Sequence, residues 1–234
     1  MGLASVKTDL NRLSNAQAAV FLQRFFKTQP GEYGHGDVFR GIRVPVLRSL
    51  AKAHQALSVR EAQELLKSKF HEDRLLALLI LIRHYSKGDD AKKARVYTLY
   101  LRHTKFINNW DLVDASAEHI VGPFLWQKDC AELRRLAVSQ SLWERRIAIM
   151  ATFHFIKQGE FRETLSLAKM LLDDNEDLIH KAVGWMLREV GKRDLKVEVA
   201  FLKKHYRRMP RTMLRYAIER FPEAVRQQYL RGGI

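Results

Sequence analysis

The apolar residues of this chain recur with the 3.6-residue period of an α-helix over almost its whole length, and this constrains the fold more than any other feature. Only 5 prolines and 12 glycines interrupt the 234 residues. No stretch shows the sustained two-residue alternation of a half-buried strand. We therefore expect an all-α protein, with helices over residues 15–27, 45–57, 58–70, 72–85, 90–103, 110–121, 130–139, 143–157, 161–172, 176–191, 195–208 and 211–220.

The helices also repeat. An alanine stands early in five of them, followed by aliphatic residues, at Ala77, Ala115, Ala148, Ala182 and Ala217. A helix-pair unit of about 35 residues is typical of an α-solenoid, in which no pair buries its apolar side without a neighbour. The alternative is a helical bundle in which this spacing arises by chance. We expect one domain over residues 1–234, a curved solenoid with a concave basic groove.

The charge balance indicates a partner. The chain has 41 Lys and Arg against 26 Asp and Glu, a formal charge of +15. Such an excess favours a polyanion, most simply nucleic acid, because binding releases counterions from the phosphates. A generally basic protein without a specific ligand is the alternative.

Several classes of protein are disfavoured. The longest apolar run, residues 75–82, is far shorter than the roughly 20 residues of a membrane-spanning helix, and the N-terminus does not resemble a secretory signal. The single cysteine, Cys130, allows no internal disulfide framework and no cysteine-built zinc site. We therefore expect a cytoplasmic protein, nucleoid-associated if bacterial, that binds no membrane.

The usual catalytic patterns are absent from the sequence. No His-x-x-x-His pair of a zinc protease and no Gly-x-Ser-x-Gly elbow occurs, and Gly34-His35-Gly36 reads as a turn rather than a phosphate-binding loop. We expect no metal and no cofactor.

One segment, residues 108–114, combines a tryptophan with carboxylates. Asn108 or Asn109 can cap a helix, and Asp111 then lies at the positive end of its dipole. Trp110 and Asp114 are four residues apart and so share one face of that helix. A carboxylate beside a tryptophan at the edge of an apolar stripe is either a structural ion-pair partner or a reactive group.

The next two repeats add cations and a second tryptophan. Arg145 and Arg146 follow Trp143, and Lys181 lies one turn before Trp185. Taken singly, these residues are explained by solvated charges and core packing. Taken together, tryptophans interleaved with cations suit nucleic-acid binding, because indoles pack on sugars and bases while cations hold phosphates.

These segments resemble the AlkD-like family of DNA alkylation repair glycosylases, which are built from HEAT-like repeats. The resemblance spans residues 14–220, and four stretches carry it. They are YGHGDVFRGIRVP at 33–45, NWDLVD at 109–114, WERRIA at 143–148 and KAVGWMLRE at 181–189.

The resemblance implies an enzyme that hydrolyses the N-glycosidic bond of cationic 3-alkyl and 7-alkyl purines in duplex DNA. Asp114 would be the catalytic carboxylate, which stabilises the oxocarbenium sugar and positions water. Trp110 and Trp185 would pack on the deoxyribose, and Arg146 would hold the neighbouring backbone. Further DNA-binding cations within or beside the matching stretches are Arg43, Arg145, Lys181 and Arg188.

The same resemblance implies a monomer without metal or cofactor. This sequence departs from the family at Asn109, where the best-known bacterial form has a second tryptophan, and in a longer loop over residues 31–36. Two alternatives remain open. One is a non-catalytic solenoid that binds damaged or branched DNA, and the other is a basic scaffold for an acidic protein.

Overall fold

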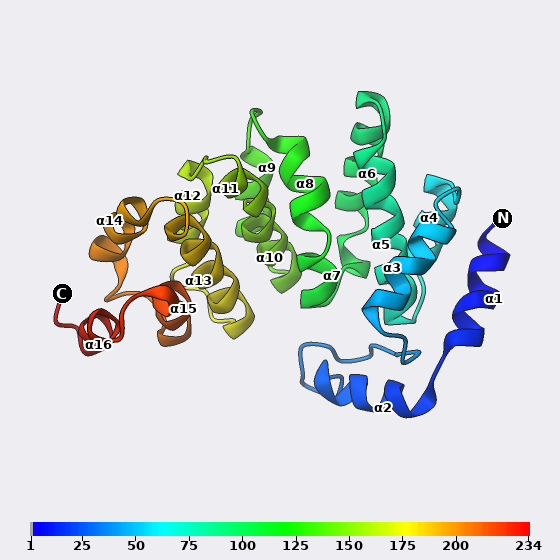
Figure 1. Ribbon diagram of the computed structural model, residues 1–234, viewed down its shortest axis with the longest axis horizontal. Coiled ribbons are helices and arrows are strands. Elements are labelled where there is room, and N and C mark those ends of the chain that lie inside the picture. Colours follow the sequence, from blue (N-terminus) through cyan, green and yellow to red (C-terminus); the bar gives the residue numbers. More distant parts are fainter. Residues whose placement is uncertain (1) are drawn as a thin grey trace. The chain divides into compact units, whose positions relative to one another are not determined.

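A computed structural model describes residues 2–234 as helices joined mostly by short connections, with one long connection over residues 26–43 (Figure 1). Within this range no strand forms, apart from one isolated bridge between Val38 and Phe70, so the all-α prediction is confirmed. No helix of the described range is long and apolar enough to cross a membrane. The α-helices are α1 (Leu3–Leu13), α2 (Ala16–Phe25), α3 (Val44–Ala53), α4 (Val59–Leu66), α5 (His71–Ser86), α6 (Asp90–Arg102), α7 (Trp110–Asp114), α8 (Ala117–Leu125), α9 (Ala131–Ala137), α10 (Leu142–Ala151), α11 (Phe153–Lys157), α12 (Arg162–Met170), α13 (Asp177–Gly191), α14 (Leu195–His205), α15 (Arg211–Ala217) and α16 (Glu223–Arg231).

The chain divides into two compact units, the first ending at Ser116 and the second spanning Ala117–Ile234. The first unit is built around α5, against which α3, α4, α6 and α7 pack. This helix is apolar on all sides over Leu75–Leu81, so it is buried all round rather than on one face. Its central position holds the surrounding helices of the unit in place.

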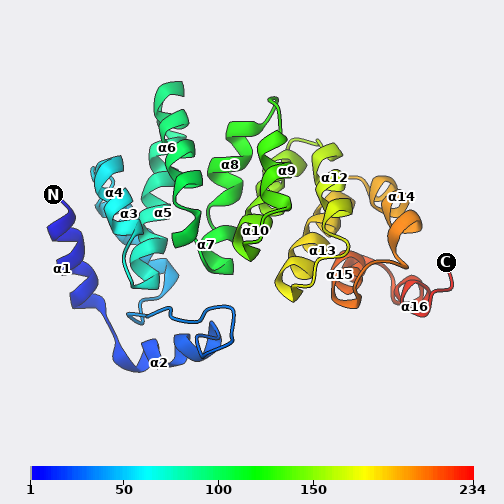
Figure 2. The same cartoon turned by 180° about the vertical axis from the view of Figure 1, so that it is seen from behind.

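The second unit shows the repeat directly. Helices α8, α10, α13 and α15 pack in succession, while α9, α12 and α14 lie beside them as the other members of the pairs (Figure 2). The repeating alanines Ala148, Ala182 and Ala217 are fully buried. An added Cβ at Gly184 would lie 2.4 Å from the Met213 carbonyl oxygen, so glycine allows α13 and α15 to approach this closely. The helix-pair prediction is confirmed.

Two of the expected helices are each divided in two. The range 110–121 is split between α7 and α8, and the range 143–157 between α10 and α11. A hydroxyl group lies at each division: Ser116 Oγ donates to the Leu112 carbonyl at 2.6 Å, and Thr152 Oγ1 donates to the Ile149 carbonyl at 2.7 Å. Such side-chain bonds to nearby carbonyls compete with the backbone hydrogen bonds of a helix. The apolar spacing continues across both divisions, so periodicity alone predicted one helix in each range.

Helices α1 and α16 are not among the helices predicted from the sequence. The apolar residues of α1, among them the buried Val6 and Leu10, follow helical spacing, so the pattern was present but short. In α16, Tyr229 is the one buried residue of the described helix, which leaves almost no apolar stripe to recognise.

One buried acid makes stability depend on pH. Glu198 in α14 is 2% exposed, and its Oε1 has no hydrogen-bond partner within residues 2–234. Its other oxygen lies against α13, where an added Cβ at Gly191 would be 1.6 Å away. Burial raises the pKa of Glu198 to about 8, against a weaker opposing effect of Arg188. The folded state therefore favours the protonated acid.

We expect Glu198→Gln to stabilise the protein at neutral pH. The unfolded chain ionises Glu198 near pH 4.5 and the folded chain only near 8, so the wild type loses stability as pH rises between these values. At pH 7 the gain from the neutral isostere should be about 3 kcal/mol, and near pH 4.5 it should vanish. Urea unfolding at the two pH values measures the change in the free energy of unfolding, and the substitution Glu223→Gln at an exposed position is the control. An equal gain at both would contradict this account.

Candidate active site

The N-terminus of α7 is capped as the sequence predicts. The side chain of Asn109 accepts a hydrogen bond from the Trp110 amide at 2.8 Å, and Asp111 Oδ1 accepts from the Leu112 amide at 2.9 Å. Asn109 is fully buried and also donates to Asp37 at 3.3 Å. The residue that stands in place of a family tryptophan therefore belongs to the internal structure of this helix end.

An ion-pair network beneath α7 joins it to α5. Both ring nitrogens of His71 meet carboxylates, with Nδ1 lying 3.0 Å from Asp37 Oδ2 and Nε2 lying 2.8 Å from Asp111 Oδ2. Arg74 donates to the second oxygen of Asp37 at 2.6 Å. The side chains of His71, Asp37 and Arg74 are all at most 5% exposed. The network thus fixes the start of α7 against the central helix.

This geometry requires a doubly protonated histidine. Burial of the ring lowers its pKa, but the charge of Asp111 and the hydrogen bonds to Asp111 and Asp37 outweigh burial and raise the pKa of His71 to about 9. For Asp37, burial raises the pKa, and the His71 hydrogen bond and the Arg74 charge hold it below its usual value. At neutral pH the network therefore contains two cations and two carboxylates.

Aromatic rings hold Trp110. Phe26 stacks on its indole with centroids 5.3 Å apart, and Phe25 meets it edge to face at 6.2 Å. Beside Trp110 lies a cavity of about 650 Å³, walled mainly by apolar residues of α2 and by the start of α3. The apolar side chains of α2 thus line a cavity rather than a closed core, since no residue of α2 is buried and Phe21 is 66% exposed.

Asp114 is the last residue of α7, one turn after Trp110 on the same helix. It is half-buried, whereas the two residues before it, Leu112 and Val113, are fully buried. Burial raises the pKa of the Tyr100 phenol, and the negative charge of Asp114 adds to that shift. The carboxylate therefore lies at the border between the core and the surface, as the sequence predicts.

In the second unit, Trp185 lies on α13 with its indole oriented by a buried acid. Its Nε1 donates to Glu189 Oε1 at 3.3 Å, and its ring lies 6.0 Å from that of Phe153. Glu189 also binds Lys192 and Arg193; burial raises its pKa, but these hydrogen bonds outweigh burial and lower it. This explains physically why a Trp and a Glu stand four residues apart in KAVGWMLRE.

The expected DNA-binding cations of α10 and α13 all bind groups of the protein. Arg145 pairs with Asp174 at 2.6 Å and donates to the carbonyls of Ser139 and Gln140. Arg146 is 4% exposed and donates to the Leu178 carbonyl. Lys181 pairs with Asp177 at 2.7 Å, and Arg188 with Glu219. The contacts of these cations with DNA stay predictions. In the structure, the same side chains join neighbouring turns and helices of the protein.

The structure brings the predicted residues together in two groups, each described within its own unit. In the first unit, Arg43 lines the same cavity as Trp110, while Asp114 ends the helix that Trp110 begins. In the second, Arg145 and Arg146 lie on α10, which packs against the α13 that carries Lys181, Trp185 and Arg188. Within residues 2–234, no cluster of three or more His, Cys, Asp or Glu side chains could hold a metal ion.

Sequence reasoning missed Asp37, His71 and Arg74 as supports of this site. Asp37 lies inside the stretch 33–45, which was noted only for its family resemblance. His71 and Arg74 belong to the charged run HEDR at residues 71–74, which matches no catalytic or ligand-binding motif. Their spacing of three residues along one helix face was the available signal.

The fold and the site together define a class of protein. It is a helical-repeat protein that carries a carboxylate and a tryptophan on one short, rigidly held helix. The family model for the DNA alkylation repair enzyme matches residues 6–221. The chain therefore belongs to the DNA alkylation repair enzyme family.

A solved structure supports the fold. The chain is similar to a protein described as a predicted DNA alkylation repair enzyme from Enterococcus faecalis, with a TM-score of 0.70 and 17% sequence identity over 90% of this chain and 97% of that one. A comparison with curated proteins finds no relative of similar sequence.

Proposed function

We propose that this family member is a DNA glycosylase that releases cationic 3-alkyl and 7-alkyl purines from duplex DNA. The observation that carries the proposal is the geometry of α7, on which Asp114 follows Trp110 by one turn. The aromatic stack holds Trp110, and the buried network holds the start of the helix through Asp111. Family membership supports a role in DNA repair, and the half-buried carboxylate supplies the chemistry.

The reaction needs little from the protein beyond electrostatics. An alkylated purine already carries a positive charge, so when the N-glycosidic bond breaks its electron pair neutralises the departing base and no general acid is required. The positive charge passes to the sugar as an oxocarbenium ion. Asp114 would stabilise that ion and orient the water that attacks it, and indole faces would add cation–π attraction.

The remaining predicted residues enter the proposal as contacts with the duplex. Trp185 would pack on the deoxyribose. Arg146 would hold the neighbouring DNA backbone through the small part of its side chain that is exposed to solvent. The proposal also takes residues 1–234 to work as one functional unit, as a monomer and, in a bacterium, at the nucleoid. Arg43, Lys181, Arg145 and Arg188 would contribute further phosphate contacts.

The test is single-turnover release of 7-methylguanine from a duplex oligonucleotide with excess protein. We expect release of the free base, leaving an abasic site that alkali cleaves. An unalkylated duplex of the same sequence is the control. No release, together with tight and salt-sensitive binding to the same duplex, would replace this proposal with a non-catalytic DNA-binding protein.

A further inference from the structure

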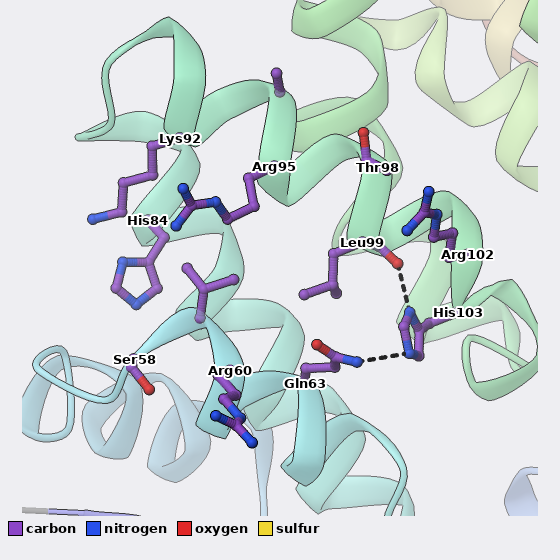
Figure 3. A pocket seen from close by; sticks show the side chains of 12 residues that line it. Ser58, Arg60, Gln63, His84, Lys92, Arg95, Thr98, Leu99, Arg102 and His103 are labelled. Atoms are coloured by element: carbon purple, nitrogen blue, oxygen red, sulfur yellow. Dashed lines mark hydrogen bonds between the residues drawn. The ribbon is translucent and has the colours of Figure 1, made fainter.

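A second basic surface of the first unit lies between α4 and α6 and takes no part in the site described above. We call it the α4–α6 cleft and define it by Arg60 and Gln63 of α4, His84 of α5, and Lys92, Arg95 and Arg102 of α6 (Figure 3). Its volume is about 710 Å³, and no acidic residue of the described chain lines it. The cleft is therefore positive along its whole length.

The cations of the cleft are available for a ligand. Within residues 2–234, none of the side chains of Arg60, Lys92, Arg95 and Arg102 forms an ion pair or a hydrogen bond with another residue. The carboxylate of Glu64 on α4 is paired with Lys67 at 2.8 Å, which lowers the pKa of Glu64, and the charge of Arg60 adds to that shift. Lys92, Arg95 and Arg102 on α6 repel one another, and an anion would relieve that repulsion.

Their spacing fits a chain of anions rather than a single one. Lys92, Arg95, Leu99 and Arg102 follow one face of α6 at intervals of three and four residues. Over the ten steps from Lys92 to Arg102 the helix rises about 15 Å, and one DNA strand carries a phosphate about every 3.4 Å along its axis. Thr98, also on this face, adds a hydroxyl between the cations, as Figure 3 shows.

The polar side chains at the far end of the cleft are arranged by internal hydrogen bonds. His103 Nδ1 donates to the Leu99 carbonyl at 2.8 Å, which leaves Nε2 to accept from Gln63 at 3.2 Å (Figure 3). His84 Nε2 donates to the Leu57 carbonyl at 2.6 Å. These bonds join the residue that follows α6 to α4, and α5 to the connection that precedes α4, so the walls of the cleft are preformed.

The cleft is separate from the surface around Trp110. No residue lines both the cleft and the cavity beside Trp110. His71, which supports α7, and His84, which lines the cleft, are thirteen residues apart on α5, about 20 Å along its axis and on different sides of the helix. DNA that contacts Trp110 would therefore reach the cleft only with another segment of its backbone.

We propose that the α4–α6 cleft binds the phosphodiester backbone of a nucleic-acid segment other than the one that holds the lesion. The inference rests on DNA being the substrate, as proposed above, but not on any chemistry at Asp114. It assigns to Lys92, Arg95 and Arg102 a role in holding or scanning DNA.

The experiment compares two double variants of equal charge. Arg95→Ala/Arg102→Ala removes two cleft cations, and Lys7→Ala/Lys52→Ala removes two exposed cations of α1 and α3. Binding to an undamaged duplex is measured over a range of salt concentrations. Each lost phosphate contact lowers the salt slope by about 1, so the cleft variant should lose about 2 in slope and bind roughly tenfold more weakly at low salt. The control should stay close to the wild type.

Release of 7-methylguanine at saturating protein separates this proposal from the previous one. We expect the cleft variant to retain the wild-type rate under those conditions. If the wild type releases no base but the slopes differ as described, the glycosylase proposal fails and the cleft proposal stands. Equal slopes for the two double variants would overturn the cleft proposal, and so would tight binding of inorganic pyrophosphate with an unchanged slope on DNA. Far-UV circular dichroism checks that both variants fold.

Discussion

Asp114→Asn should lower the rate of 7-methylguanine release at least about 100-fold while leaving DNA binding intact. Asparagine keeps the shape of the side chain but removes the charge that would face the oxocarbenium sugar. Removal of one electrostatic group aimed at a developing charge typically costs a factor of 100 to 1,000 in rate. Single-turnover release with excess protein measures the chemical step, and a titration of an undamaged duplex measures binding.

Asp173→Asn is the matched control for this prediction. It causes the same change in net charge at a side chain that is 74% exposed and paired with Arg208. Any general gain in DNA affinity from the lost negative charge should therefore appear in both variants. If Asp114→Asn released the base as fast as the control, Asp114 would have no part in the mechanism.

The helical repeat could be read from the sequence because it depends on local periodicity. Ala148, Ala182 and Ala217 recur at nearly constant spacing, and each is fully buried between packed helices. The cap at Asn109 could be read for the same reason, since it involves adjacent residues. The divisions at Ser116 and Thr152 could not, because whether a hydroxyl bonds its own helix depends on packing around it.

The residues that support the site could not be predicted from the sequence, because their contacts join positions that are far apart in the chain. His71 meets Asp37 across 34 residues and Asp111 across 40, and neither pairing has a pattern in the sequence. Likewise, the sequence places Arg146 on the predicted helix but does not show that its guanidinium binds the Leu178 carbonyl. The contacts of His71 and of Arg146 depend on where each side chain points in the tertiary structure, and a single sequence does not determine this.

Removing one carboxylate from the buried network beneath α7 should destabilise the protein strongly. In Asp37→Asn, His71 and Arg74 keep their positive charges but lose one of the two carboxylates that balance them. Breaking a buried ion pair on one side commonly costs about 3–5 kcal/mol, because the remaining charge stays buried without compensation. Asp129→Asn, which removes a 78% exposed partner of Arg134, should cost less than about 1 kcal/mol.

The pH dependence distinguishes this explanation from a simple packing defect. The pKa of His71 is raised from 6.5 to about 9, so its contribution to stability is complete below pH 6.5 and is lost as pH rises through 9. Asp111, the larger cause of the raised pKa of His71, remains in Asp37→Asn, so this pKa should fall only part of the way toward 6.5. The stability difference between wild type and Asp37→Asn should then narrow by about 1 kcal/mol from pH 6.5 to above pH 9, because the narrowing equals the part of the His71 pKa shift that Asp37 causes.

Urea unfolding at the two pH values measures how far the stability difference between wild type and variant narrows. The rate of 7-methylguanine release tests whether the network also matters for function. Asp37 also accepts from Asn109, the cap of the helix that carries Trp110 and Asp114. If the network positions those two residues, the variant should release 7-methylguanine more slowly even at saturating DNA and at temperatures where it is fully folded. A variant that is less stable by the same amount at both pH values, and that excises at the wild-type rate, would show that Asp37 contributes only packing.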